Sequence, residues 1–167
     1  TPDTVKKFIA TRHTVVVQAG AGVNASVPDA NFSAVGASIV NDAVTAYASD
    51  IILKVQAPTA EEIALIKDGA TVVAMFDPYR NPNLAAFAAK NAQCFALELL
   101  PRTLSRAQNM DVLSSQSNLA GYKSVLLAAN EYQRPFPMFM TSAGTAKPVR
   151  VIIMGVGVAG LQAIATA

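Results

Sequence analysis

The stretch IILKVQAPTAEEIALIKDGATVVAMF, residues 51–76, decides the fold class. Both of its ends, residues 51–55 and 71–76, are short apolar runs rich in the β-branched residues that strands favour. Between these runs Pro58 ends the first strand, and Thr59 and Glu62 have the spacing of a capping box, which starts a helix. Gly69 then acts as a C-terminal stop for that helix. The order strand, helix, strand predicts a crossover between two parallel strands.

The same alternation continues on both sides of this stretch. Further strands are predicted at residues 14–17, 38–40 and 93–97, and helices at the N-terminus and at residues 28–37 and 83–91. The strands are apolar nearly throughout, which is typical of strands covered on both faces. We therefore predict an α/β fold with an open parallel sheet and crossover helices, Rossmann- or flavodoxin-like, in a domain of residues 1–110.

The remainder of the chain has a different character. Residues 111–133 predict one long interdomain helix of about six turns, in which Gly121 permits close packing. Residues 134–167 predict a linker followed by the first strand, turn and helix of a second Rossmann domain, with the strand at residues 149–154.

Composition excludes several classes of protein. Hydrophobic residues make up 52% of the chain and charged residues 14%, so it can bury a core and is not disordered. The 13 Lys+Arg and 11 Asp+Glu form no basic run of the kind that nucleic-acid binding requires. One cysteine, Cys94, excludes an internal disulfide, and no metal site is predicted.

The tail "VIIMGVGVAGLQAIATA", residues 151–167, contains the glycine spacing of a dinucleotide-binding turn. Gly155 allows the tight turn, Gly157 admits a pyrophosphate, and Gly160 lets helix and strand pack closely. Val158 and Ala159 complete the turn, where backbone N–H groups at a helix start face the phosphates. The alternative is a tight turn that binds nothing. The acidic residue that holds the ribose is expected about 20 residues further on, beyond Ala167.

A second group of polar residues lies in "PRTLSRAQNMDVLSSQSNLAGYKSV", residues 101–125. It places Arg102, Gln108, Asp111 and Ser114 in a loop and at the start of the long helix. The residues alone slightly favour a capped helix, with Asp111 as the cap and solvated arginines.

This second group and the glycine turn, together with "TPDTVKKF" and "DIILKVQAPTAEEIALIKDGA", resemble the NAD(H)-binding component of proton-translocating NAD(P) transhydrogenase, in the alanine dehydrogenase/transhydrogenase superfamily. The resemblance covers essentially the whole chain. It implies that NAD(H) binds in a cleft between two domains and that hydride passes to NADP(H) on a partner component. It also implies a homodimer and a membrane-spanning subunit that couples the reaction to proton movement. The component would then be peripheral to the inner membrane, on the cytoplasmic side in bacteria or the matrix side in mitochondria.

In this family an Arg-Gln-Asp loop holds the nicotinamide end of NAD, and the resemblance carries this role to Arg102, Gln108 and Asp111, with Ser114 beside them. The family pattern has one residue fewer before Arg-Ala-Gln, so Arg106 is an alternative to Arg102. The resemblance implies no residue that performs covalent or acid/base catalysis. Relative to the family pattern the chain lacks a first strand and most of the nucleotide domain. We therefore expect the 167 residues alone to bind NADH weakly and to transfer no hydride.

Two alternatives follow from the same resemblance. The chain could be a truncated, non-catalytic structural or interaction subunit. It could instead be a soluble alanine dehydrogenase, an enzyme that uses a lysine after a strand and a later histidine. Lys54 lies at a lysine-like position, but residues 77–80 contain no histidine and His13 is distant in sequence. The sequence therefore favours the transhydrogenase interpretation, with Lys54 as a structural residue.

Overall fold

The computed structural model describes all residues, 1–167. The chain divides into two compact units, residues 1–96 and 97–167, which are described separately. None of its helices combines the length and the apolar composition that crossing a membrane would require.

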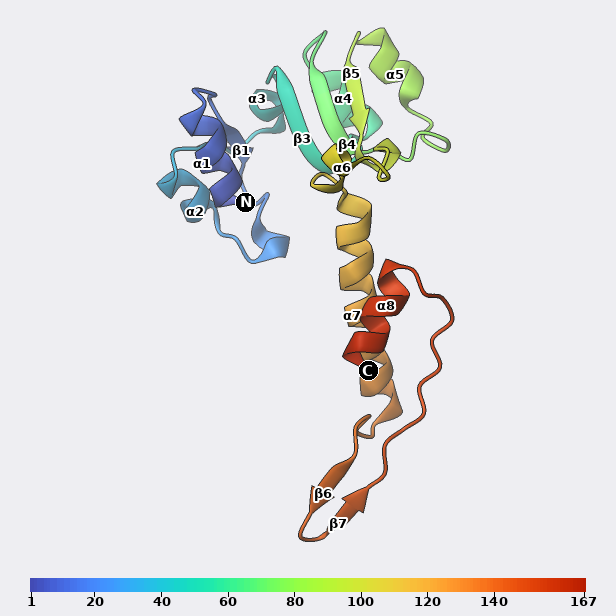
Figure 1. Ribbon diagram of the computed structural model, residues 1–167. Coiled ribbons are helices and arrows are strands. Elements are labelled where there is room, and N and C mark those ends of the chain that lie inside the picture. The colour runs from blue at the N-terminus through green and yellow to red at the C-terminus, as the bar shows by residue number, and fades with distance from the viewer. The chain divides into compact units, whose positions relative to one another are not determined.

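The first unit alternates short helices with short strands (Figure 1). Its helices are α1 (Pro2–Ala10), the 3-10 helix η1 (Val23–Ala25), α2 (Asp29–Ala34), α3 (Ala43–Tyr47), α4 (Ala60–Leu65) and α5 (Leu84–Ala89). Its strands are β1 (Val16–Gln18), β2 (Ser38–Val40), β3 (Ile51–Gln56), β4 (Thr71–Met75) and β5 (Gln93–Ala96). Every strand predicted here is confirmed to within two residues at either end. Helix α3 was not predicted.

The predicted helix starts in this unit are also confirmed. Thr1 caps α1 by accepting a hydrogen bond from the Thr4 N–H at 3.4 Å. At α4 both halves of the capping box form: the Glu62 N–H donates to Thr59 Oγ1 at 3.3 Å, and the Thr59 N–H donates to the Glu62 carboxylate at 2.7 Å.

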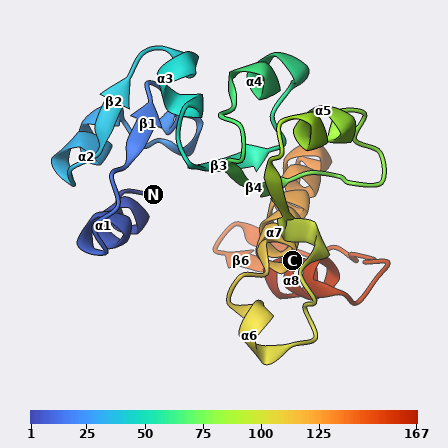
Figure 2. The ribbon, with the colours of Figure 1, turned by 90° about the horizontal axis from the view of Figure 1, so that it is seen from above.

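All strand pairs of the first unit are parallel, as predicted, but they form two sheets instead of one. Strands β1 and β2 make one pair, and β3, β4 and β5 make a three-stranded sheet in that order. Helices α4 and α5, which connect the strands of the second sheet, lie on the same side of it (Figure 2).

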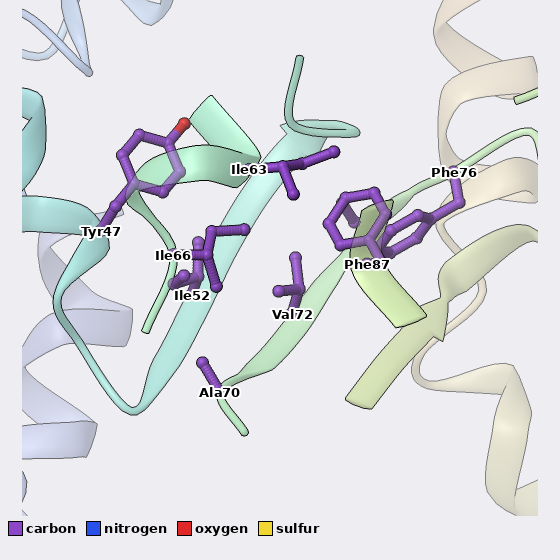
Figure 3. Packing of buried hydrophobic residues seen from close by; sticks show 9 residues of the cluster. Tyr47, Ile52, Ile63, Ile66, Ala70, Val72, Phe76 and Phe87 are labelled. Atoms are coloured by element: carbon purple, nitrogen blue, oxygen red, sulfur yellow. The ribbon is translucent and has the colours of Figure 1, made fainter. Parts of the chain in front are cut away.

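One face of the three-stranded sheet carries the main core (Figure 3). Val72 and Ala74 of β4 are completely buried, and Ile63 and Ile66 beside them are 2% and 1% exposed. Phe87 of α5 packs edge-on against Phe76, with 5.3 Å between ring centroids. The core therefore lies between the central strand and the crossover helices.

The opposite face differs from the prediction that both faces are covered. In β3 only Ile52 is buried, whereas Ile51 and Leu53 are each 56% exposed. Phe95 of β5 is 57% exposed on the same face. Apolar composition alone could not distinguish a strand covered on both faces from one covered on one face.

The second unit is built around one long helix, α7 (Val112–Tyr132), which confirms the predicted long helix and its start at Asp111. The other elements of the unit are η2 (Leu97–Leu99), α6 (Ser105–Gln108), β6 (Phe139–Thr141), β7 (Gly144–Ala146) and α8 (Val158–Thr166). Helix α8 lies alongside α7, and the two run in the same direction (Figure 1).

Two expectations for this unit are corrected. Residues 149–154, predicted as a strand, have no strand assignment because no neighbouring strand pairs with them. Within the predicted linker there is an antiparallel hairpin, in which β6 pairs with β7 from Phe139 opposite Ala146 to Thr141 opposite Gly144.

Candidate functional site

All nine predicted site residues lie in the second unit, at or near the N-terminal ends of its two longer helices. They are Arg102, Gln108, Asp111 and Ser114 near the start of α7, and Gly155, Gly157, Val158, Ala159 and Gly160 at the start of α8.

The three glycines of the turn before α8 each have a different steric situation. Gly155 has φ of +120°, a conformation that side-chain-bearing residues rarely adopt. A Cβ at Gly160 would lie 2.7 Å from the Gly155 carbonyl carbon, so only glycine fits there. A Cβ at Gly157 would meet no protein atom within 4 Å, and Gly157 has ordinary backbone angles. The protein itself therefore explains Gly155 and Gly160, but it does not explain Gly157.

Helix α8 begins directly after this turn and leaves its start uncapped. Gly157 is the N-cap residue and has no side chain to accept a hydrogen bond from the first turn. The first N–H groups of any helix lack partners within the helix and carry its positive end charge. Here Val158, Ala159 and Gly160 make up that first turn. An uncapped start beside open space is the arrangement that can accept a phosphate.

Asp111 caps α7, as the residues alone suggested. Its carboxylate accepts the Ser114 N–H at 2.9 Å and the Ser114 hydroxyl at 2.6 Å. These hydrogen bonds, with a smaller contribution from the nearby Arg102 charge, hold the pKa of Asp111 below its usual value. Asp111 is therefore an anion that fixes the start of α7.

The residues before Asp111 form a short polar segment. Arg106 and Gln108 belong to α6, and Arg102 lies before it; all three residues are exposed. Only Arg102 has an electrostatic effect on Asp111. The Asp111 N–H donates to the Gln108 carbonyl at 3.3 Å, which connects α6 to the cap of α7. The structure thus places Arg102, Gln108, Asp111 and Ser114 in one local group.

The two groups of residues are joined through α7. Gly121 of α7 is buried where the backbone of Ala159 crosses it. Asp111 lies ten residues before Gly121, which is about 15 Å along a helix. Because α7 and α8 run in the same direction, the positive ends of both helices point the same way (Figure 1). The structure places the groups on one scaffold without bringing them into direct contact.

Two further features of the molecule were not foreseen from the sequence. Lys54 donates to both Glu62 carboxylate oxygens at 2.7 and 2.6 Å, and Glu62 also bonds the Tyr47 side chain. Glu62 is predictable as a member of a capping box, but its partner eight residues away is not. In the second unit, two cavities of about 290 and 490 Å³ lie near Tyr132 and Arg150, at the opposite end of α7 from Asp111.

Comparison with known proteins places the chain among nucleotide-dependent oxidoreductases. The family model "Alanine dehydrogenase/PNT, N-terminal domain" matches residues 1–120, and the corresponding C-terminal domain model matches residues 124–167. The first of the polypeptides that make up NAD(P) transhydrogenase subunit alpha in Rhodospirillum rubrum is 50% identical over 99% of this chain and 45% of the relative. Alanine dehydrogenase of Halomonas elongata is 28% identical over 98% of this chain and 44% of the relative.

Solved structures give the same result. A transhydrogenase structure from Sinorhizobium meliloti matches with a TM-score of 0.94 and 48% identity, over 99% of this chain and 50% of that one. An L-alanine dehydrogenase structure matches with a TM-score of 0.84 at 24% identity, which shows the shared fold. The chain spans about half the length of these relatives. Since the two family models together match nearly every residue, the chain belongs to the alanine dehydrogenase/PNT family.

Proposed function

We propose that this chain contributes to the NAD(H) site of a proton-translocating NAD(P) transhydrogenase. In that reaction hydride passes between NAD(H) here and NADP(H) on a partner component, while a membrane-spanning subunit couples the transfer to proton movement. The high identity to a transhydrogenase subunit over the whole chain supports this proposal. The component would lie at the inner membrane, on its cytoplasmic or matrix side.

The observation that carries the proposal is the open space at Gly157. No protein atom lies within 4 Å of the position that a Cβ would occupy, so packing within the chain does not require glycine there. A side chain at that position would fill the space in front of the first turn of α8, where a pyrophosphate would lie. The residues present therefore fit a dinucleotide.

The chain's own residues hold and orient the cofactor. The N–H groups of Val158, Ala159 and Gly160 would bind the pyrophosphate, as expected for an uncapped helix start. Arg102 or Arg106, with Gln108, would bond the nicotinamide end. Asp111 and Ser114 would anchor this loop through the cap of α7.

NAD(H) supplies the hydride chemistry when bound, and the protein contributes position and orientation. No residue of the chain is assigned covalent or acid/base catalysis. The protein instead has to hold one nicotinamide ring at contact distance from the other. This makes the rigidity of the two helix starts the functional property.

A homodimer is also proposed, and the hairpin supports it. Isolated two-stranded hairpins are at most marginally stable in water. All residues of β6 and β7 are exposed, and Phe139 and Met140 are 52% and 74% exposed. A second copy of the chain would bury these side chains.

Lys54 weakens the alternative of an alanine dehydrogenase. Its ammonium group is held by both oxygens of Glu62 and is only partly exposed, so it is engaged in linking β3 to α4. The segment after β4 contains Asp77, Pro78, Tyr79 and Arg80, and no histidine.

The test is NADH binding by the full-length protein, measured by calorimetry, with two valine variants. Gly157→Val fills the open space at the turn, whereas Ala165→Val adds a similar side chain at an exposed position near the far end of α8. We expect Gly157→Val to weaken NADH binding by at least about tenfold with an unchanged melting temperature, and Ala165→Val to bind as wild type. A wild-type protein that binds no NADH would overturn the proposal and favour a non-catalytic structural subunit. Equal binding by wild type and Gly157→Val would remove the glycine turn from the site.

A further inference from the structure

Gly121 is the only glycine within a helix interior where another helix crosses at backbone contact. It lies near the middle of α7 and is buried. A Cβ built at Gly121 would lie 2.9 Å from the carbonyl carbon of Ala159, and closer still to its carbonyl oxygen. The obstructing atoms belong to the backbone of α8, so no change of side-chain rotamer could relieve the overlap.

The contact falls at the functional end of α8. Ala159 belongs to the first turn of the helix, between Gly157 and Gly160, where the N–H groups face the proposed pyrophosphate position. One turn further along each helix, Val125 of α7 and Ala163 of α8 are also buried, at 8% and 6% exposure. Small residues thus set a short distance between the two helices where the site begins.

We infer that Gly121 is a positioning residue for the dinucleotide-binding turn: its missing side chain sets where the first-turn N–H groups of α8 lie. This inference rests on the proposed function, because it concerns the same NAD(H) site. Any residue larger than glycine at position 121 displaces the start of α8, and with it the N–H groups that would bind the pyrophosphate.

Helix propensity alone argues against glycine at this position. Glycine in a helix interior is less favourable than alanine because it loses more backbone freedom on folding. In the absence of α8, an alanine at position 121 would strengthen α7. The glycine is therefore explained by its neighbour and not by the helix that contains it.

The experiment compares NADH affinity, melting temperature and amide hydrogen exchange in the full-length protein for wild type, Gly121→Ala and Gly121→Ser. Ala120→Val is the matched control, because it enlarges the adjacent, exposed residue of α7. We expect Gly121→Ala and Gly121→Ser to weaken NADH binding at least about tenfold and to accelerate amide exchange at residues 158–161 in the ligand-free protein. We expect the control to match wild type in both measurements.

A purely structural role predicts a different result, namely a lower melting temperature with unchanged affinity of the folded protein and unchanged exchange at α8. That result would overturn the inference, as would variants that match wild type throughout. Including Gly157→Val separates this failure from failure of the proposed function. If Gly157→Val loses NADH binding while Gly121→Ala retains it, only the role of Gly121 is wrong. If wild type binds no NADH, the proposed function fails, and the exchange data alone decide whether Gly121 sets the start of α8.

Discussion

Glu62 joins three elements of the first unit, so its charge should contribute measurably to stability. Its carboxylate accepts the Lys54 ammonium from β3, the Thr59 N–H at the start of α4, and the Tyr47 hydroxyl from α3. Glu62→Gln keeps the size of the side chain but removes the charge, which leaves Lys54 without a counter-ion. The free energy of unfolding should fall as a result.

The magnitude follows from the partial burial of the pair. Hydrogen bonds to charged groups contribute about 1.5–3 kcal/mol when well formed, and exposed ion pairs contribute about 0.2–1 kcal/mol. Lys54 and Glu62 side chains are 30% and 29% exposed, between these limits. We expect a loss of about 1–2 kcal/mol, with a shift in melting temperature of about 2–4 °C per kcal/mol for a chain of this size.

The loss should depend on pH. Partial burial by itself raises the pKa of Glu62, but the hydrogen bonds from Lys54, Thr59 and Tyr47 outweigh it, so the pKa is lowered. A carboxyl whose pKa is lower in the folded state stabilises the fold at pH values above the unfolded pKa, about 4.3. That contribution disappears as the pH falls through the folded pKa. The difference between wild type and Glu62→Gln should therefore be full at pH 7 and vanish in acid.

The assay is urea unfolding followed by circular dichroism at pH 7 and at several acidic pH values. Glu61→Gln is the control, because Glu61 is adjacent, exposed and outside the Lys54 contact. Equal stabilities of the two variants at pH 7 would refute the reasoning. So would a deficit in Glu62→Gln that persists unchanged at the most acidic pH at which the protein folds.

Three other outcomes are expected. Ile66→Ala should lower the free energy of unfolding by about 2–5 kcal/mol because it opens a cavity in the core, whereas Val55→Ala, at a residue 82% exposed, should change it little in denaturant titrations. Asp111→Ala removes the cap of α7 and the anchor of the Arg102 loop, so calorimetry should show weaker NADH binding, and Asp111→Asn should retain more affinity because an amide oxygen can still accept the Ser114 N–H. The full-length protein should produce no NADH from L-alanine and NAD in an absorbance assay, and robust turnover there would restore the alanine dehydrogenase alternative.

Much of the fold was predictable because its signals are local. The capping box at Thr59, the Asp111 cap and the β-branched strands all depend on residues close together in sequence, and the structure contains each of them. Helix α3 was missed because five residues are too few to show a helical period, although Asp42 does cap it.

The failures concern properties that depend on distant neighbours. Residues 149–154 are apolar and β-branched, but a strand requires a partner, and none pairs with them. The exposed face of β3 follows from helices that cover only the other side. In the site, the sequence indicated which glycines form the turn, whereas the contact between Gly121 and Ala159 joins residues 38 positions apart and needed the structure.

The continuous helix from Asp111 to Gly121 restricts how the chain can change in length during evolution. One inserted residue between them would rotate Gly121 by about 100° about the helix axis and shift it by about 1.5 Å. It would turn the gap for α8 away from Ala159 while leaving the cap at Asp111 in place. Insertions in this family should therefore accumulate before the cap, around Thr103 and Leu104, or in the hairpin at residues 139–146. The ten-residue interval itself should keep a fixed length even where its sequence varies.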